Sequence, residues 1–277
     1  MQIAVLSGKG GTGKTTVSTN LARLINAKYI DCDVEEPNGF IFLEPQNVKK
    51  TDVCIPVPSI DEDKCLHCKK CVEICQFNAL VHTDKVILFE KLCHGCGACQ
   101  AVCPSMAITE KDRPIGKIEI GTNGNMECLS GTLNVTEPMA GPIISKLKSM
   151  IDDEITIIDC SPGSSCNVVK SLLDVDYAIL VTEPTEFGLH DLKIAVELVR
   201  KMKIPFGVII NRVSQEDNTT FRYCRQENIN IIGEIPFDRN IAVIYSKGEL
   251  LINHQEYKNI FSDISLKLKE VMGCNLL

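Results

Sequence analysis

The sequence predicts an α/β protein with a mostly parallel β-sheet, into which a second, smaller domain of α+β type is inserted. Strand-length runs of Ile, Val and Leu alternate with helical stretches, which is typical of a parallel sheet covered by helices on both faces. A glycine-rich segment follows the first run, and regularly spaced cysteines occupy the interval between residues 65 and 103. The 277 residues are enough for one large α/β domain and an insert.

The composition limits the kinds of partner and the cellular location that we expect. The formal net charge is −7 and no extended block of Lys or Arg occurs, so nucleic acid is not a favoured partner. The longest apolar runs have strand length and no charged segment precedes the first one, so we expect neither a membrane span nor a secretory signal. We therefore expect a cytoplasmic protein, whose 15 cysteines include metal ligands rather than disulfides.

A phosphate-binding loop follows the strand predicted at residues 3–6. The segment matches G-x-x-x-x-G-K-[ST] and leads into a helix predicted at 17–25. Its glycines let backbone N–H groups point at phosphate oxygens, and the positive end of the helix adds to that field. Lys14 is expected to reach the β- and γ-phosphates, and the Thr15 hydroxyl to ligate Mg²⁺. The loop residues predicted to bind the nucleotide are Gly8, Lys9, Gly10, Gly11, Thr12, Gly13, Lys14, Thr15 and Thr16.

An acidic loop follows the next predicted strand, at residues 28–30. It lies beyond the carboxyl end of a strand that neighbours the phosphate loop, where ligands bind in open α/β sheets. The carboxylates that could contact a ligand there are Asp31, Asp33, Glu35 and Glu36.

The phosphate loop, with its additional Lys9, resembles the deviant Walker A motif of the MinD/ParA superfamily of P-loop ATPases. The resemblance implies that ATP joins two copies of the chain into a homodimer, in which Lys9 crosses to the partner's nucleotide. The alternative is that Lys9 is a solvated loop residue. The resemblance also implies that Asp33 is the switch carboxylate, while the other acidic residues of its loop remain alternatives.

A second strand end, at Asp159, completes the predicted ATPase site. Asp159 closes an apolar run as a Walker B residue does, and we expect it to hold Mg²⁺ through a water; the alternative is that it caps the following helix. The segment at 161–163 would then sense the γ-phosphate. By the same resemblance, Asn211 and the Pro236-x-Asp238 loop recognise adenine. The predicted catalytic residues are Lys9, Lys14, Asp33 and Asp159.

Eight cysteines form an internal repeat, in which the second run begins 28 residues after the first. Each run has the spacing C-x₂-C-x₂-C-x₃-C of bacterial ferredoxins, whose fourth cysteine ligates the other [4Fe–4S] cluster. The predicted ligand sets are Cys65, Cys68, Cys71 and Cys103 for one cluster, and Cys93, Cys96, Cys99 and Cys75 for the other. Zinc is the alternative metal. The clusters could transfer electrons, or simply stabilise an insert too small for a core of its own.

The remaining elements follow from the apolar pattern. We expect prolines to end a short strand at 53–58, which places the ATPase in residues 1–58 and 113–277 and the ferredoxin-like insert in 59–112. Further strands are predicted at 118–120, 154–159, 177–182, 206–211 and 229–232, and further helices at 142–148, 192–202 and 260–271.

The whole chain resembles superfamily ATPases that carry an inserted ferredoxin domain, with two departures from related iron–sulfur proteins. Mrp-type carriers have a C-x-x-C near the C-terminus, whereas Cys224 and Cys274 stand alone here. Cys166 has the spacing from Asp159 of a cluster ligand in the nitrogenase iron protein, but that protein's second ligand is replaced by Met139. We therefore expect Cys166 to be a buried small side chain. We expect the same of the four cysteines without ligand-like spacing, Cys32, Cys54, Cys128 and Cys160.

These observations together predict an ATP-dependent redox protein. Mg·ATP binding would close the dimer and gate electron transfer through two [4Fe–4S] clusters to a metalloenzyme or a cofactor-assembly partner. The alternative is a factor that assembles or delivers iron–sulfur or other metal cofactors. A third hypothesis, a positioning scaffold like MinD, is less favoured because the sequence lacks a basic amphipathic helix at its C-terminus.

Overall fold

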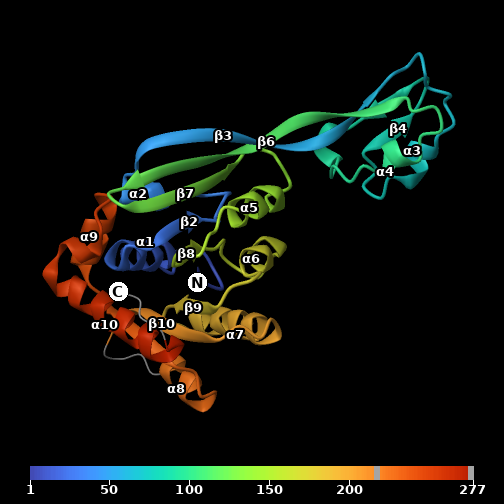
Figure 1. Ribbon diagram of the computed structural model, residues 1–277. Helices are drawn as coiled ribbons and strands as arrows, with labels where there is room; N and C mark the ends of the chain where they lie inside the picture. The colour runs from blue at the N-terminus through green and yellow to red at the C-terminus, as the bar shows by residue number, and fades with distance from the viewer. Residues whose placement is uncertain (215–218, 274–277) are drawn as a thin grey trace.

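A nine-stranded sheet forms the centre of the computed structural model, which describes residues 1–214 and 219–273 (Figure 1). The strand order is β11-β10-β9-β1-β8-β2-β7-β6-β3. Neighbours are parallel from β11 to β7 and antiparallel from β7 to β3, so the sheet is mostly parallel, as predicted. The parallel strands are β1 Gln2–Leu6, β2 Lys28–Asp31, β7 Met126–Leu133, β8 Thr156–Asp159, β9 Tyr177–Thr182, β10 Phe206–Val213 and β11 Ile231–Pro236.

Helices cover both faces of this sheet and enclose two apolar cores. On β1, Ile3 and Val5 point into one core, and Ala4 and Leu6 into the other, as the period of a strand requires. One face carries α1 Lys14–Ile25, α2 Gly39–Leu43, α9 Arg239–Ser246 and α10 Gln255–Met272, and the other α5 Gly141–Lys148, α6 Cys166–Ser171, α7 Glu186–Lys201 and α8 Thr219–Gln226. Within the described part of the chain, no helix is long and apolar enough to cross a membrane.

A long antiparallel hairpin extends the sheet beyond β7. Its strands, β3 (Gln46–Ile60) and β6 (Ile108–Asn123), pair from end to end and project from the helix-covered body (Figure 1). The prediction that prolines end a short strand at 53–58 is wrong, because Pro56 and Pro58 both lie within the ladder. β3 is the edge strand, so these prolines can lack the N–H group without breaking a bond in the sheet interior.

A small cysteine-rich lobe, residues 61–107, lies at the end of this hairpin (Figure 1). The positions at which the sequence suggests domain boundaries therefore lie inside β3 and β6. The lobe contains α3 Lys70–Ile74, β4 Leu80–His82, β5 Val86–Leu88, a 3₁₀ turn at Glu90–Leu92 and α4 Ala98–Ala101. Its buried cluster is small and consists of Cys71, Leu80, Val86 and Ile108.

Several predicted boundaries shift in the structure. The residues expected to form a strand at 118–120 belong to the much longer β6, and the sequence analysis does not predict β7. The last strand lies at Ile231–Pro236 rather than at 229–232. The helices expected at 17–25, 142–148, 192–202 and 260–271 correspond to α1, α5, α7 and α10.

Two cysteines are not buried as expected. Cys54 is exposed because it alternates with the inward-facing Val53 and Ile55 on the edge strand β3, and Cys166 is exposed as the first residue of α6. Burial is confirmed for Cys32, Cys128 and Cys160. The prediction for Cys274 lies outside the described residues.

Candidate functional site

The glycine-rich loop joins β1 to α1 at the carboxyl edge of the parallel strands. Gly11 and Gly13 have φ values of +79° and +97°, a conformation that L side chains rarely adopt. A Cβ atom on Gly13 would lie 2.3 Å from Nδ2 of Asn211, so contact with β10 also requires glycine there. The same Asn211 amide donates to the Thr12 carbonyl oxygen at 2.8 Å, which ties the loop to the strand predicted to contact adenine.

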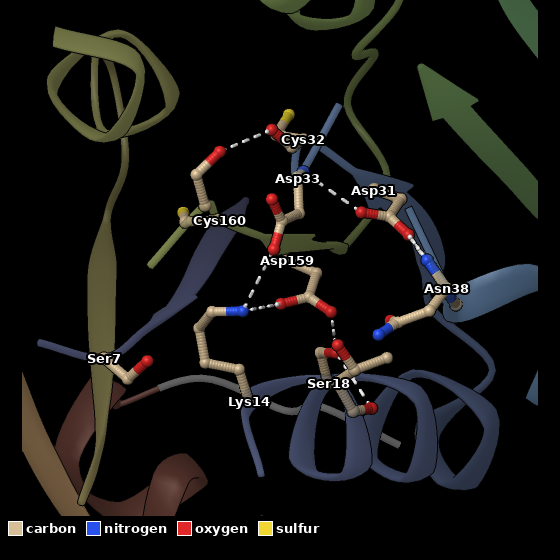
Figure 2. Close-up of polar contacts among 12 residues, drawn as sticks. Ser7, Lys14, Ser18, Asp31, Cys32, Asp33, Asn38, Asp159 and Cys160 are labelled. Atoms are coloured by element: carbon tan, nitrogen blue, oxygen red, sulfur yellow. Dashed lines mark hydrogen bonds and ion pairs between the residues drawn. The ribbon is translucent and has the colours of Figure 1, made fainter. Parts of the chain in front are cut away.

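Lys14 lies between the two predicted catalytic carboxylates (Figure 2). Its Nζ is 3.5 Å from Oδ2 of Asp33 and 3.7 Å from Oδ1 of Asp159. Burial lowers the pKa of Lys14, but the carboxylates of Asp159 and Asp33 outweigh burial and raise its pKa overall. The lysine is therefore a buried cation beside the loop, as phosphate binding requires.

Asp159 ends β8 and is completely buried. Its Oδ2 accepts hydrogen bonds from the Ser18 hydroxyl at 2.9 Å (Figure 2) and the Tyr29 hydroxyl at 3.2 Å, whereas Oδ1 accepts no hydrogen bond among the described atoms and faces Lys14. The residue before α6 is Ser165, so Asp159 does not cap that helix. A buried carboxylate oxygen that lacks a hydrogen bond and faces Lys14 fits a site for a water of hydrated Mg²⁺.

The neighbouring aspartates of β2 and its following loop have different surroundings. Asp31 is completely buried, and its carboxylate accepts N–H bonds from Asp33, Asn38 and Gly39 at 3.0 to 3.1 Å. Burial, followed by the Asp159 charge, raises the pKa of Asp31 to about 8. Burial also raises the pKa of Asp33 to about 6, although Lys14 opposes the shift. Asp31 therefore shapes the loop, and Asp33 is the carboxylate that faces Lys14.

An open cavity of about 1180 Å³ extends from the phosphate loop to the C-terminal part of the chain. It brings Asp33, Asn211 and Pro236 together with Asp238, and apolar side chains such as Tyr245 complete its wall. Asp238 itself accepts the Tyr257 hydroxyl at 2.6 Å and caps α9, so its carboxylate also holds the wall in place. The residues lining this cavity are Gly10, Gly11, Thr12, Gly13, Lys14, Thr15, Thr16, Asp33, Glu36, Asn38, Pro162, Asn211, Arg212, Pro236, Phe237, Asp238, Ile241, Ala242 and Tyr245.

Three predicted site residues, Gly8, Lys9 and the fully buried Asp159, do not line this cavity. A Cβ atom on Gly8 would lie 2.4 Å from the Asp191 carbonyl oxygen, so Gly8 permits close packing against α7. Nζ of Lys9 is 3.6 Å from Oε2 of Glu183, and Oε1 of the same carboxylate accepts the Arg212 guanidinium at 2.5 Å. In this single chain, Lys9 therefore pairs with Glu183 and does not line its own nucleotide cavity.

The cysteines of the lobe surround two hollows. All members of the first predicted ligand set line one hollow, of about 360 Å³, which we call the first hollow. All members of the second set line another, of about 400 Å³, which we call the second hollow. The cysteines of the first hollow are Cys65, Cys68, Cys71 and Cys103, and those of the second are Cys75, Cys93, Cys96 and Cys99. The fourth cysteine of each run thus lies with the other run, as the ferredoxin pattern requires.

The chemistry around these hollows fits thiolate-bound cubane clusters. N–H groups of Ala79 and Gly95 donate to the sulfur atoms of Cys75 and Cys93 at 3.3 and 3.5 Å, and such bonds are typical of cluster sites. Burial raises the pKa of Cys71. Among the described residues, no three His, Cys, Asp or Glu side chains converge on one point as the ligands of a single metal ion do.

The residues that sequence reasoning missed are contacts across the sheet. Ser18 and Tyr29 orient Asp159 from α1 and β2, and they are separated from it by 141 and 130 residues. Phe237 and Tyr245 line the cavity beside the predicted adenine contacts. The aromatic residues near Pro236 could have been predicted to line the cavity from their position in the sequence. Nothing local in the sequence links Tyr29 to Asp159.

A parallel sheet with a glycine-rich loop, a buried lysine and two strand-end carboxylates defines a P-loop nucleotide-binding protein. The chain belongs to the family of CobQ/CobB/MinD/ParA nucleotide binding domains, whose family model matches residues 3–252.

Relatives and solved structures agree with this assignment. The protein MJ0579 of Methanocaldococcus jannaschii is 34% identical over 274 residues, which cover 96% of each chain. An iron-sulfur cluster carrier protein of Pyrococcus horikoshii is 23% identical over 98% of this chain and 88% of its own. The cytosolic Fe-S cluster assembly factor NUBP2 homolog of Dictyostelium discoideum is 28% identical over 96% and 91%. The fold is similar to that of MinD from Pyrococcus horikoshii in complex with Mg-ADP, with a TM-score of 0.62 and 19% identity over 98% and 97% of the two chains.

Proposed function

We propose that this protein is an ATPase that holds two [4Fe–4S] clusters and uses Mg·ATP to deliver iron–sulfur cofactors to a partner protein. The observation that carries the proposal is the pair of hollows, each lined by one complete ferredoxin-type ligand set, on a nucleotide-binding body. Relatives named as iron–sulfur carriers and assembly factors support delivery, and one named as cytosolic supports a cytoplasmic location. We assign the ATPase to residues 1–58 and 113–277 and the clusters to 59–112.

The residues of the nucleotide cavity have distinct proposed roles. Loop N–H groups and Lys14 bind the phosphates, while the apolar wall near Pro236 receives the base. Thr15 and Oδ1 of Asp159, which accepts no hydrogen bond among the described atoms, are positioned to hold Mg²⁺, which when bound supplies positive charge at the β- and γ-phosphates. Asp33 orients the attacking water and moves when the phosphate charge neutralises its neighbour Lys14.

The second copy of the chain supplies Lys9 in this proposal. Because Lys9 is held by Glu183 outside its own cavity, it is available to a partner across the nucleotide. We expect Lys9→Ala to retain nucleotide binding and to lose ATP-dependent dimerisation and turnover. Light scattering with and without Mg·ATP tests this, and unchanged turnover would contradict the trans role of Lys9.

A short series of backbone bonds supports communication between the nucleotide and the hairpin. Directly after Asp33, the Val34 carbonyl oxygen accepts the N–H of Leu133, the last residue of β7, at 2.8 Å. The next N–H, of Asn134, donates to the Ile115 carbonyl oxygen of β6 at 2.9 Å. The acidic loop is therefore bonded to the strand that leads into the cluster lobe.

A buried ion pair continues this connection. NH1 of Arg113 on β6 is 2.6 Å from Oε1 of Glu137, which lies in the loop that follows β7. The remaining guanidinium nitrogens and Oε2 of Glu137 are buried without partners among the described atoms. Close to the pair, the β3–β6 register shifts between Val53 and Cys54. This ion pair lies beside a β-bulge, and several of its buried polar atoms lack hydrogen bonds. Such a place is suited to a change in the angle of the hairpin.

Electron transfer to a redox partner is the second candidate function. The ferredoxin spacing and the exposure of Cys68 and Cys96, one cysteine in each set, favour it because both clusters would be open to a partner.

Cluster transfer distinguishes the two functions. Anaerobically reconstituted protein is mixed with an apo-acceptor that binds a [4Fe–4S] cluster, with and without Mg·ATP, and iron in each protein is counted after separation. Delivery predicts that iron moves to the acceptor faster with Mg·ATP. Retention of about eight irons through repeated reduction and oxidation, with no transfer, would overturn delivery and favour electron transfer.

A further inference from the structure

The two cluster sites of the proposed function share one backbone but differ in charge. The central segments of the two runs align as Cys68-Lys69-Lys70-Cys71 and Cys96-Gly97-Ala98-Cys99. Lys69 has φ +64° and ψ 0°, and Gly97 has φ +71° and ψ −5°, so both residues adopt the same left-handed conformation before a short helix. The repeat therefore places a lysine where its counterpart has glycine.

Lysine is an unfavourable residue for that conformation. Left-handed backbone is adopted routinely by glycine and only reluctantly by residues with a long side chain. The second run satisfies the same turn with Gly97, so the fold itself does not require Lys69. A lysine in a strained backbone position beside a predicted cluster draws attention to what its side chain contributes there.

The lysines also lie at the hollow itself. Lys69 and Lys70 both line the first hollow, together with Leu66 and His67. Neither forms an ion pair within the described parts of the chain, whereas the nearby Lys64 is neutralised by Asp61 at 2.9 Å. The first hollow thus has two uncompensated positive charges.

The second hollow has the opposite character. Its charged lining residue, apart from the cysteines, is Glu110 of β6. A Cβ atom placed on Gly97 would lie 3.4 Å from Oε1 of this carboxylate, so the negative charge adjoins the position that corresponds to Lys69. Pro56, Phe77 and His94 also line this hollow, and the rings of Phe77 and His94 stack with their centroids 3.6 Å apart.

We propose that Lys69 and Lys70 make the cluster of the first hollow the electron-accepting one, with a higher reduction potential than the cluster of the second hollow. A positive charge stabilises the additional negative charge of a reduced cluster, and a carboxylate opposes it. A single electron supplied by a strong reductant therefore resides at the first hollow. This inference rests on the proposed presence of two clusters.

The test replaces the two lysines of the first cysteine run by the residues found at the same positions of the second run. The variant Lys69→Gly with Lys70→Ala reproduces the Gly97-Ala98 sequence and keeps every cysteine. The control, Lys49→Ala with Lys85→Ala, removes the same charge from exposed positions that line neither hollow. Anaerobic titration with dithionite at fixed ionic strength, followed by electron paramagnetic resonance, gives a potential for each cluster.

We expect the higher potential to fall in the Gly-Ala variant, with a change of about tenfold in its reduction equilibrium, or 59 mV for one electron. The lower potential and the control should remain close to wild type. The reciprocal variant, Gly97→Lys with Ala98→Lys, should raise the lower potential. If wild type holds both clusters and neither exchange moves one potential selectively, the charge assignment is wrong. If wild type holds no clusters, both the proposed function and this inference are wrong.

Discussion

The helix-covered body and the cysteine-rich lobe differ in what holds them together. In the body, Ile3, Ile157 and Ile179 are completely buried between the sheet and its helices, within cores that extend over most of both faces. In the lobe, exposed apolar side chains such as Met106 and Leu66 surround a small buried cluster that contains Cys71 itself. The body can fold on hydrophobic burial, whereas the lobe requires crosslinks or clusters to supplement its core.

The largest effect should come from the buried cysteine of the lobe. Cys71→Ser removes a ligand of the first hollow, so we expect iron to fall from about eight to about four per chain. The lobe should become sensitive to protease, while nucleotide affinity is preserved. Cys54→Ser is the matched control, because Cys54 is exposed on β3 and lines neither hollow. Equal iron in the two variants would refute the ligand assignment.

The next prediction changes the nucleotide site of the body and leaves the cysteines of the lobe intact. Lys14→Ala removes the buried cation beside Asp33 and Asp159, and we expect nucleotide affinity to fall on the order of 100-fold, as loss of a charge-assisted phosphate contact implies. Calorimetric titration measures the affinity, and iron analysis should give the wild-type value. Loss of iron in this variant would show that the two regions do not fold separately.

The pH dependence of stability should report the buried carboxylates of the body. Asp33 has a pKa raised from 3.8 to about 6, so the folded state binds a proton more tightly than the unfolded state does. Stability without nucleotide should therefore fall as pH rises from about 4 to about 6, by about 3 kcal/mol for this group. Asp33→Asn should make the fall between pH 4 and 6 shallower in urea unfolding, and the slope that remains there comes from Asp31.

The slope between pH 6 and 8 should survive in Asp33→Asn, because Asp31 has a pKa of about 8 in the folded protein. A flat profile over the whole range in wild type would contradict the buried state of both carboxylates.

A smaller effect is expected at the connection between the two regions. Glu137→Gln removes the charge that pairs with buried Arg113, and we expect a loss of about 2 kcal/mol in unfolding free energy. Nucleotide affinity should not change, but the response of the lobe to Mg·ATP in hydrogen exchange should weaken. Glu119→Gln is the control, since Glu119 lies elsewhere on β6 and pairs with Lys50 of β3. Equal responses in the two variants would remove the pair from the proposed connection.

Local spacing predicted the parts of the molecule that are local in sequence. The phosphate loop lies within a single stretch of sequence, and the spacing of the two cysteine runs assigns Cys75 and Cys103 to opposite ligand sets. The phosphate loop and the ligand sets could therefore be predicted from the sequence alone. The edge position of β3, which tolerates Pro56 and Pro58, depends on pairing with β6 across the whole lobe. No pattern within either strand contains that information.

The roles of neighbouring acidic residues were not predictable for a related reason. Asp31 and Asp33 both follow the same apolar strand, and only the fold shows that N–H groups at 38 and 39 surround Asp31. The hydroxyls that orient Asp159 likewise come from distant elements. Sequence therefore identified the chemistry of the site, and long-range pairing decided which residue performs it.

Cooperation between the nucleotide cavity and the cluster lobe can be measured through the cluster potentials. They should be determined anaerobically with and without Mg·ATP, after an iron count on the same sample, in wild type and in Lys14→Ala. We predict about eight irons and a potential that shifts with Mg·ATP in wild type and not in the variant. Full iron with potentials and cluster transfer rates that ignore Mg·ATP would contradict it.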